Sequence, residues 1–429
     1  MANEGYLKYI DLSYTPSEDD LIVLFKFKAN KGVSEKEAAG AIAAESSTGT
    51  WTDLATMDPS RAASLGAKVF SFNKEYVKIA YPLNLFELGN MPQIYSSVCG
   101  NIFGMKEVAS LRVEDIKWPL KLIKSFKGPK FGVQGVRKIT KIKDRPLCGT
   151  IIKPKLGLNE KEHAKVAYEA WVGGIDIVKD DENLTSQSFN KFEKRARETI
   201  KMKEKAEKET GEKKIYMCNI TAETNEMLKR AEYLKQMGNE YLMVDIHTVG
   251  WSALQTLRNY AGKLGLVMHG HRAMHAAFTR NKEHGINFMV IAETARLIGL
   301  DQLHIGTGVG KMEGSAEEIK NISKQIQLQL IEPDDKNNLL GNNWGDIKPV
   351  FSVSSGGLHP GHVPALINNL GKNIIIQAGG GVHGNPLGTS KGATAMRQAI
   401  DSVMNNIPLK EYAQTHPELQ AALSKWGEY

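Results

Sequence analysis

The stretch GGIDIVKDDEN, from Gly173 to Asn183, begins as a strand and ends abruptly in charge. Its apolar run, Ile175–Val178, is followed at once by the four charged residues KDDE. Because successive strand residues point to opposite faces, Lys179 and Asp181 can share a face, and Glu182 turns off the strand end. Two carboxylates and a lysine would then meet at one small site.

The carboxylates of this stretch are hard oxygen ligands of the kind that Mg²⁺ prefers, and Mg²⁺ usually takes only one or two of them from a protein. An ammonium group repels a cation, so Lys179 can join such a site only after losing its charge. Reaction of the neutral amine with CO₂, which gives an anionic carbamate, would remove it. The alternative is a surface turn with one lysine–carboxylate ion pair, and the tetrapeptide alone favours that alternative.

Outward from this stretch, short β-type runs recur from about residue 150 and alternate with helix-compatible segments such as Glu160–Trp171 and Glu226–Met237. Eight such units predict an α/β protein with a (β/α)₈ TIM barrel. The expected strands are Thr150–Lys153, Ile175–Lys179, Ile215–Ile220, Tyr241–Ile246, Gly265–His269, Gln302–Gly306, Val350–Ser354 and Asn373–Ala378.

The rest of the chain does not follow this alternation. Residues 1–125 predict a separate, smaller α+β domain, expected to be ferredoxin-like, and residues 126–429 form the barrel domain. The polar interval Glu332–Asp346 reads as an inserted loop before the seventh strand, and a helical tail follows Gly388.

Composition excludes several classes of protein. The 429 residues are 41% hydrophobic and 24% charged, which is ordinary for a soluble globular chain, and no apolar run approaches the length of a membrane span. The N-terminus has no secretory pattern, and Cys99, Cys148 and Cys218 read as reduced core residues, so we expect a cytoplasmic protein. The net charge of +7 is moderate, and the most highly charged segment contains both acidic and basic residues. This pattern argues against nucleic-acid binding and is compatible with small anionic substrates.

Polar residues gather where the predicted strands end, the face on which barrel enzymes carry their catalytic groups. They are Lys153 and Lys155 after the first strand, Lys179, Asp181 and Glu182 after the second, His269, His271, Arg272 and His275 after the fifth, and His304 with Gly306 and Thr307 after the sixth.

Glycine clusters follow the seventh and eighth predicted strands, at Ser354–Gly357 and Gly379–Gly381. Glycine runs let backbone N–H groups approach an anion, and these two loops often bind phosphate in barrels. Arg272, His304 and Lys311 add a second basic pocket. The pattern predicts a Mg²⁺-dependent barrel enzyme for a doubly phosphorylated, sugar-like substrate.

These residues resemble one family over nearly the whole chain, the large subunit of ribulose-1,5-bisphosphate carboxylase/oxygenase (RuBisCO). The segments that carry the resemblance are AAESSTGTW at 43–51, GNIFG at 100–104, KPKLGL at 153–158, GGIDIVKDDEN at 173–183, HGHRAMHAAFTR at 269–280, HIGTGVGKMEG at 304–314, SSGGLHPG at 354–361 and QAGGGVHGNPLG at 377–388.

The resemblance implies carboxylation and oxygenation of ribulose 1,5-bisphosphate by CO₂ and O₂, with Lys179 carbamylated by CO₂. The carbamate, Asp181 and Glu182 would hold Mg²⁺, and the carbamate would take the C3 proton to give an enediolate. Lys153 would be the acid/base group at C2, and His271 would assist hydration and proton transfer. Lys311, on a mobile loop, would orient CO₂.

The resemblance also implies which residues hold the substrate. Those expected at the C5 phosphate and a hydroxyl are Arg272, His304 and Ser355, with Gly356 and Gly357 beside them. Those expected at the C1 phosphate are Gly379, Gly380, Thr50, Trp51 and Lys311, and Lys155 and Gln377 complete the set. The histidines His269, His275, His359 and His383 are left open between support of the site and simple hydrogen bonding.

Four residues of the first domain complete the site of a neighbouring subunit in the family: Glu45, Thr50, Trp51 and Asn101. Glu45 would pair with Lys311. The resemblance therefore implies a homodimer or a higher assembly of dimers, and no small subunit is expected.

Three departures from the plant-type pattern are Ile151 for a threonine, Gly308 for an apolar loop residue and Asn385 for a histidine. With the shorter chain, they indicate the archaeal form III branch, in which the substrate derives from AMP and other nucleosides. The alternatives are a RuBisCO-like enolase or isomerase of sulfur salvage, and a non-enzymatic binding protein. The first is disfavoured because Glu45, Asn101, Lys153, Lys179, His271, Lys311 and Ser355 are all present. The second is disfavoured because a binding protein would have no reason to keep a metal triad, a loop lysine and two phosphate pockets together.

Overall fold

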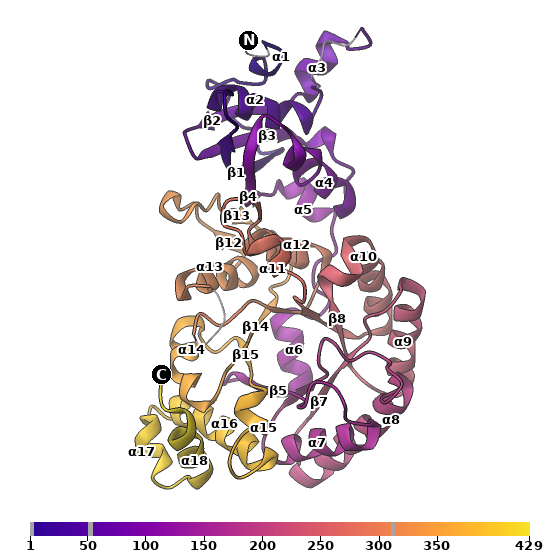
Figure 1. Cartoon of the computed structure of the whole chain (residues 1–429). Helices are drawn as coiled ribbons and strands as arrows, with labels where there is room; N and C mark the ends of the chain where they lie inside the picture. The colour runs from indigo at the N-terminus through magenta and orange to yellow at the C-terminus, as the bar shows by residue number, and fades with distance from the viewer. Residues whose placement is uncertain (1–3, 50–54, 310–313) are drawn as a thin grey trace. The chain divides into compact units, whose positions relative to one another are not determined.

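The computed structural model describes residues 4–49, 55–309 and 314–429 (Figure 1). The chain divides into two compact units. The first comprises Met1–Gly128, Met274–Ile298 and Leu328–Ile347, and the second comprises Pro129–Ala273, Gly299–Gln327 and Lys348–Tyr429.

The second unit is built on a closed barrel of eight parallel strands, which confirms the predicted (β/α)₈ fold. The order around the barrel is β11-β14-β15-β5-β6-β7-β8-β9. The strands are β5 (Leu147–Ile151), β6 (Ile177–Lys179), β7 (Ile215–Asn219), β8 (Tyr241–Asp245), β9 (Val267–His271), β11 (Gln302–His304), β14 (Phe351–Ser355) and β15 (Ile374–Gln377).

The first barrel strand differs from its predicted position. It spans Leu147–Ile151, not Thr150–Lys153, so Lys153 follows the strand and does not belong to it. All five strand residues are buried, and a strand buried on both faces has no polar alternation to mark its limits in the sequence. The other seven predicted strands overlap the observed ones, with ends that shift by a few residues.

Helices flank the barrel strands (Figure 1). They are α6 (Gly132–Thr140), α7 (Glu160–Val172), α8 (Phe192–Thr210), α9 (Thr224–Gln236), α10 (Ile246–Leu264), α13 (Ala316–Gln327), α14 (Val363–Leu370), α15 (Gly380–His383) and α16 (Thr389–Met404). The C-terminal part of the chain forms α16, α17 (Leu409–Ala413) and α18 (Pro417–Trp426), and a 3₁₀ turn, η4 (Pro360–His362), precedes α14.

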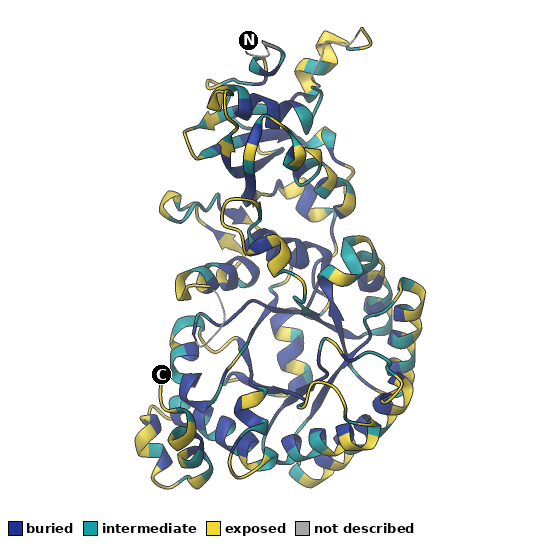
Figure 2. Ribbon diagram, in the orientation of Figure 1, coloured by how far each residue is buried: buried dark blue, intermediate teal, exposed yellow. Residues whose placement is uncertain are grey.

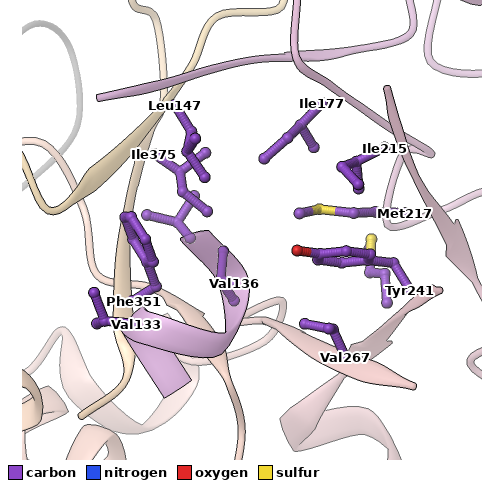
Figure 3. Close-up of a cluster of buried hydrophobic side chains, with 12 residues drawn as sticks. Val133, Val136, Leu147, Ile177, Ile215, Met217, Tyr241, Val267, Phe351 and Ile375 are labelled. Carbon is purple, nitrogen blue, oxygen red and sulfur yellow. The ribbon is translucent and has the colours of Figure 1, made fainter. Parts of the chain in front are cut away.

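The barrel interior is filled by apolar side chains, because every second residue of a strand points inward (Figure 3). Ile215 and Met217 of β7 belong to this core, and Val133 and Val136 of helix α6 pack into it. A barrel filled in this way is a packed core and no pore. The expected site residues therefore lie at the ends of the strands and in the loops that follow them.

The first unit is an α+β domain, as predicted, built on a five-stranded sheet of order β10-β4-β1-β3-β2. Its strands are β1 (Asp20–Ala29), β2 (Lys68–Phe72), β3 (Tyr76–Pro82), β4 (Val108–Lys117) and β10 (Gly285–Ile286). Its helices are α1 (Glu4–Leu7), α2 (Glu35–Glu45), α3 (Pro59–Leu65), α4 (Met91–Val98), α5 (Leu120–Lys124), α11 (Ala276–Thr279) and α12 (Phe288–Ile298), with the 3₁₀ turns η1 (Leu83–Leu85) and η2 (Asn101–Gly104).

Two later parts of the chain also belong to the first unit. Strand β10 pairs in parallel with β4. The expected loop Glu332–Asp346 lies in the segment Leu328–Ile347, which carries a 3₁₀ turn, η3 (Asp335–Asn337), and a short pair of strands, β12 (Leu330–Ile331) and β13 (Asn342–Asn343).

Burial follows this architecture: the barrel strands are largely buried, and exposed residues lie on the outer sides of the helices (Figure 2). Cys148 and Cys218 are buried, Cys99 is half-buried, and none of the three forms a disulfide. Across residues 4–49, 55–309 and 314–429, no helix combines the length and apolar character that a membrane crossing needs.

Candidate active site

Five of the expected site residues are the last residues of barrel strands. They are Lys179 of β6, His271 of β9, His304 of β11, Ser355 of β14 and Gln377 of β15. Parallel strands of one barrel end on the same face, so the sequence-distant positions converge there.

Lys179 is fully buried at the centre of this group. Its Nζ donates to the carbonyl oxygen of Asp180 at 2.7 Å and lies 3.9 Å from Oε2 of Glu182. Burial lowers the pKa of Lys179, and it outweighs the nearby carboxylates, of which Glu182 is the strongest influence in the opposite direction. The amine is therefore easier to deprotonate than an exposed lysine.

Repulsion by the neighbouring lysines Lys153 and Lys155 does not account for this lowered pKa. Lys153 Nζ lies 2.9 Å from Oδ2 of Asp181, and Lys155 Nζ lies 3.2 Å from Oε1 of Glu182. Each ammonium group is thus paired with a carboxylate, and desolvation is the dominant effect on Lys179.

Asp181 and Glu182 form a pair of carboxylates that faces cationic groups. Asp181 is buried, while the side chain of Glu182 is 23% exposed. Burial raises the pKa of Glu182, but Lys179 and His271 outweigh it and bring the pKa to about 2. Both His271 and Lys155 approach this carboxylate, with His271 Nε2 3.7 Å from Oε2.

This donor set fits Mg²⁺ only if Lys179 contributes. Within the described residues, no group of three His, Cys, Asp or Glu side chains is placed to hold a metal ion. Asp181 and Glu182 supply two hard oxygen donors, and a carbamate on the buried Lys179 would supply the third. The residues therefore fit a site for Mg²⁺ formed after modification of the lysine.

Three histidines meet beside the carboxylates. His304 Nε2 lies 2.8 Å from His269 Nε2, and His269 Nδ1 lies 2.9 Å from Oε1 of Gln302. His271 Nδ1 lies 3.0 Å from Oδ1 of Asp245. Burial, with repulsion from neighbouring cations, lowers the pKa of each of these histidines.

The prediction that His304 contributes positive charge to a basic pocket is wrong, because the pKa of its ring is lowered. Its pKa lies well below the ordinary value, because the ring is buried and His271 and His269 adjoin it. His304 is neutral at pH 7 and offers a hydrogen bond, without positive charge. Arg272 supplies the charge: burial lowers its pKa only to about 10, and its guanidinium donates to the carbonyl oxygen of Ile305.

The two glycine clusters adjoin each other and Lys153. Ser355 and Gln377 are register partners on β14 and β15. A Cβ on Gly379 would come within 2.9 Å of Cε of Lys153, so the side chain of this lysine reaches the loop after β15. The loop after β15 and the lysine after β5 therefore face one space.

The other histidines left open have local partners. His383 lies 3.1 Å from Oγ1 of Thr150, and His275 lies 2.9 Å from Oγ1 of Thr279. His359 stacks on Trp426. His269 contacts the expected site residue His304, and the backbone N–H of His383 donates to the carbonyl oxygen of Gly379.

Thr50, Trp51 and Lys311 lie outside the described residues. Glu45 ends helix α2 and Asn101 begins η2, so both lie in the first unit.

Two of the three sequence departures have local explanations. Gly308 has φ 62°, and a Cβ there would come within 2.8 Å of Cα of Ala316, so a side chain does not fit. Asn385 Oδ1 accepts from the backbone N–H of Leu387, and its amide donates to the carbonyl oxygen of Glu418. Ile151 ends β5 as a buried residue.

Sequence reasoning missed polar residues that end the two strands between β6 and β9. Asp245 ends β8 and orients His271, and Asn219 ends β7. The amide of Asn219 donates to the carbonyl oxygens of Asp181 and Glu182. Both residues are visible in the sequence as the polar ends of buried runs, YLMVD and IYMCN.

Comparison with known proteins gives matches over both units. The family model for the catalytic domain of the ribulose bisphosphate carboxylase large chain matches residues 132–426, and that for its N-terminal domain matches residues 8–122. Ribulose bisphosphate carboxylase of Methanosarcina mazei is 51% identical over 97% of this chain and 98% of its own length.

Solved structures give the same result. A dimeric archaeal Rubisco from Hyperthermus butylicus is 47% identical, with a TM-score of 0.94 over 99% of this chain and 100% of its own. The octameric ribulose-1,5-bisphosphate carboxylase/oxygenase of Pyrococcus horikoshii is 49% identical, with a TM-score of 0.91 over 98% of this chain and 97% of its own.

Proposed function

The chain belongs to the ribulose bisphosphate carboxylase large chain family, as an enzyme of that class, and we propose that it carboxylates ribulose 1,5-bisphosphate to two molecules of 3-phosphoglycerate with Mg²⁺ as its metal. The observation that carries the proposal is the convergence of Lys179, Asp181 and Glu182 with Lys153 and His271 on one barrel face. O₂ would compete with CO₂ for the same intermediate.

Lys179 as a carbamate, with Asp181 and Glu182, would hold Mg²⁺, which would polarise the substrate ketone and stabilise oxyanion charge as a Lewis acid. Lys153 is a proton donor within reach of this point, because its Nζ lies 2.9 Å from Asp181. His271 is held by Asp245 through Nδ1, so its Nε2 faces Glu182 and the substrate space. A neutral imidazole in this orientation suits general base catalysis.

The two phosphates of the substrate would be held at opposite sides of this centre. Arg272 supplies a permanent positive charge for the C5 phosphate, and Ser355 with the neutral His304 supplies hydrogen bonds. Backbone N–H groups of Gly379 and Gly380 would bind the C1 phosphate, close to Lys153. Lys155, Gln377, Gly356 and Gly357 complete the proposed substrate-binding set.

The direct test is formation of labelled 3-phosphoglycerate from ribulose 1,5-bisphosphate and labelled bicarbonate, after preincubation with CO₂ and Mg²⁺. Absence of this product, with enolisation or isomerisation of a related substrate, would instead support a RuBisCO-like enzyme. We place the reaction in the breakdown of AMP and other nucleosides, in view of the similarity to archaeal enzymes.

We further propose that the active unit is a homodimer, or an assembly of dimers, in which Glu45, Thr50, Trp51 and Asn101 complete the partner's site. Solved relatives include a dimeric and an octameric archaeal enzyme. Each dimer would then contain two sites, each built from one barrel and the other chain's first unit.

This arrangement predicts complementation between two defective chains. A heterodimer of Glu45→Gln and Lys179→Ala chains contains one site free of both substitutions, so we expect about half of the unsubstituted activity. Differently tagged chains would be coexpressed, and the heterodimer would be purified and assayed.

The matched control places both substitutions in one chain and pairs it with an unsubstituted chain. Its two sites then carry one substitution each, so activity should fall well below that of the first heterodimer. Equal activity of the two heterodimers, or a fully active monomer in light scattering, would contradict shared sites.

A further inference from the structure

Asp180 stands between two residues of the proposed metal site but points away from it. Its carboxylate is fully buried and lies among His163 of α7, Arg195 of α8 and residues of β7. Lys179 and Asp181, one residue to either side, belong to the mouth of the barrel. The proposed chemistry assigns no role to this buried charge.

Four donors satisfy the carboxylate of Asp180. Oδ1 lies 3.0 Å from His163 Nε2 and accepts from the hydroxyl of Tyr216 at 2.8 Å. Oδ2 accepts from Arg195 Nε and from the backbone N–H of Asn219, both at 3.0 Å. An ionised carboxylate has about four acceptor sites, so its capacity is filled. The side chain has a single well-defined position.

Arg195 extends this connection to the loop that follows the metal-site residues. It is fully buried, and its Nη2 donates to the carbonyl oxygen of Thr185, while Nη1 lies 3.1 Å from Oδ1 of Asn190. One guanidinium thus holds Asp180 and the far part of the loop together.

Asn219 connects the same carboxylate to the backbone of the metal-site residues. Its N–H donates to Asp180, and its side-chain amide donates to the carbonyl oxygens of Asp181 and Glu182. Lys179 Nζ in turn donates to the carbonyl oxygen of Asp180. The direction of each of the three proposed ligands therefore depends on the backbone that Asp180 anchors.

We propose that Asp180 is a positioning residue, which fixes the segment Lys179–Glu182 so that its three ligand side chains converge on one Mg²⁺ ion. The inference rests on the proposed function for the identity of the ion. It adds that affinity for the metal depends on a buried carboxylate that never touches it, acting with Arg195 and Asn219. Partners of this kind typically contribute about 10- to 100-fold to metal affinity.

The test measures metal binding directly, with the whole chain and Mn²⁺ as the probe. Mn²⁺ prefers the same oxygen donors as Mg²⁺, and its free concentration is read from its electron paramagnetic resonance signal. Titrations are run with and without bicarbonate. Asp180→Asn keeps the shape but loses the charge, so the buried guanidinium of Arg195 loses its anionic partner. We expect its dissociation constant for Mn²⁺ in bicarbonate to rise about 10- to 100-fold.

Asp176→Asn is the matched control. Asp176 lies four positions earlier in the chain, just before β6, and is also buried with an arginine: Arg145 donates to it at 2.7 and 2.8 Å. It also accepts from the backbone N–H of Cys148. The control should lose thermal stability as Asp180→Asn does, while its affinity for Mn²⁺ stays unchanged.

Tyr216→Phe keeps the proposal testable if Asp180→Asn does not fold. It removes one neutral donor and leaves the Asp180–Arg195 ion pair intact, so we expect a several-fold weakening of Mn²⁺ binding. Tyr241→Phe, at a buried tyrosine of the neighbouring strand β8, is its control and should bind Mn²⁺ normally.

A second measurement separates positioning from a direct catalytic role. At saturating Mg²⁺, Asp180→Asn should recover carboxylation with an unchanged KM for ribulose 1,5-bisphosphate, because only assembly of the site is weakened. Normal Mn²⁺ affinity in Asp180→Asn would overturn the proposal. If that variant does not fold, normal Mn²⁺ affinity in folded Tyr216→Phe would overturn it instead. An equal loss of Mn²⁺ affinity in Asp176→Asn would also overturn the proposal, because it would show that loss of any buried carboxylate loosens the metal site.

The proposed function can fail separately. If the unsubstituted chain binds Mn²⁺ in a bicarbonate-dependent way but fixes no carbon, the proposed reaction is wrong, while the effect of Asp180→Asn on Mn²⁺ still decides the positioning role. If the unsubstituted chain binds no Mn²⁺, the metal site and the positioning role are both wrong.

Discussion

The Lys179→Arg variant is expected to lose carboxylation by several orders of magnitude, whatever the preincubation with CO₂ and Mg²⁺. Carbamate formation joins the neutral amine to CO₂ and releases one proton. A guanidinium stays protonated at any pH that the protein tolerates, so it cannot take part in this reaction. The variant would keep a positive charge where the proposed site needs an anionic oxygen donor.

The surroundings of Lys179 support this expectation. The amine is fully buried, and burial lowers its pKa from the ordinary value near 10.4. The fraction of neutral amine at a given pH is therefore larger than for an exposed lysine. Its carbonyl partner, the backbone oxygen of Asp180, orients Nζ without supplying an ion pair.

Lys214→Arg is the control for the size of the substituted group. Lys214 is equally buried, lies just before β7 at the other end of the barrel, and donates to the carbonyl oxygen of Ile175. We expect this variant to retain carboxylation. Carbon fixation and binding of labelled CO₂ would be measured on both variants. Full activity of Lys179→Arg, or activation of the unsubstituted chain in CO₂-free buffer, would contradict the carbamate.

The barrel could be predicted from the sequence because its eight buried strands alternate with helical segments. The limits of β5 could not, since Leu147–Ile151 lies within a longer apolar run without alternation. The assignment of Leu328–Ile347 to the first unit depends on contacts distant in sequence. For example, the side chain of Asn342 accepts a hydrogen bond from the backbone N–H of Trp118. No local sequence pattern predicts a contact between residues so far apart in the chain.

The positions of the candidate site residues could be predicted, but their electrostatics could not. Polar residues at strand ends identify Lys179, His271 and Ser355, and the same rule applied to every strand also finds Asn219 and Asp245. Charge states depend on burial and on neighbours brought together by folding. The lowered pKa of His304 and the cause of the lowered pKa of Lys179 became visible only in three dimensions.

Lys311→Ala is expected to separate two steps of the proposed reaction. Lys311 lies outside the described residues, in the loop Gly306–Gly314 that resembles a closing lid of the family. Its ammonium would stabilise the carboxylate charge that develops as CO₂ adds, an interaction made mainly in the transition state. Loss of one such group typically costs roughly 10²- to 10³-fold in rate, so carboxylation should fall by at least that factor.

Exchange of the substrate C3 proton with solvent precedes CO₂ addition and should remain measurable in Lys311→Ala. Tritium exchange and carbon fixation would be measured on one preparation, with Lys320→Ala, an exposed lysine of α13, as the control. A surface lysine without function predicts no change in either rate. Equal loss of both rates would mean that the loop shapes the whole metal site. Loss of carbon fixation with retained exchange is the outcome that assigns Lys311 to CO₂ addition alone.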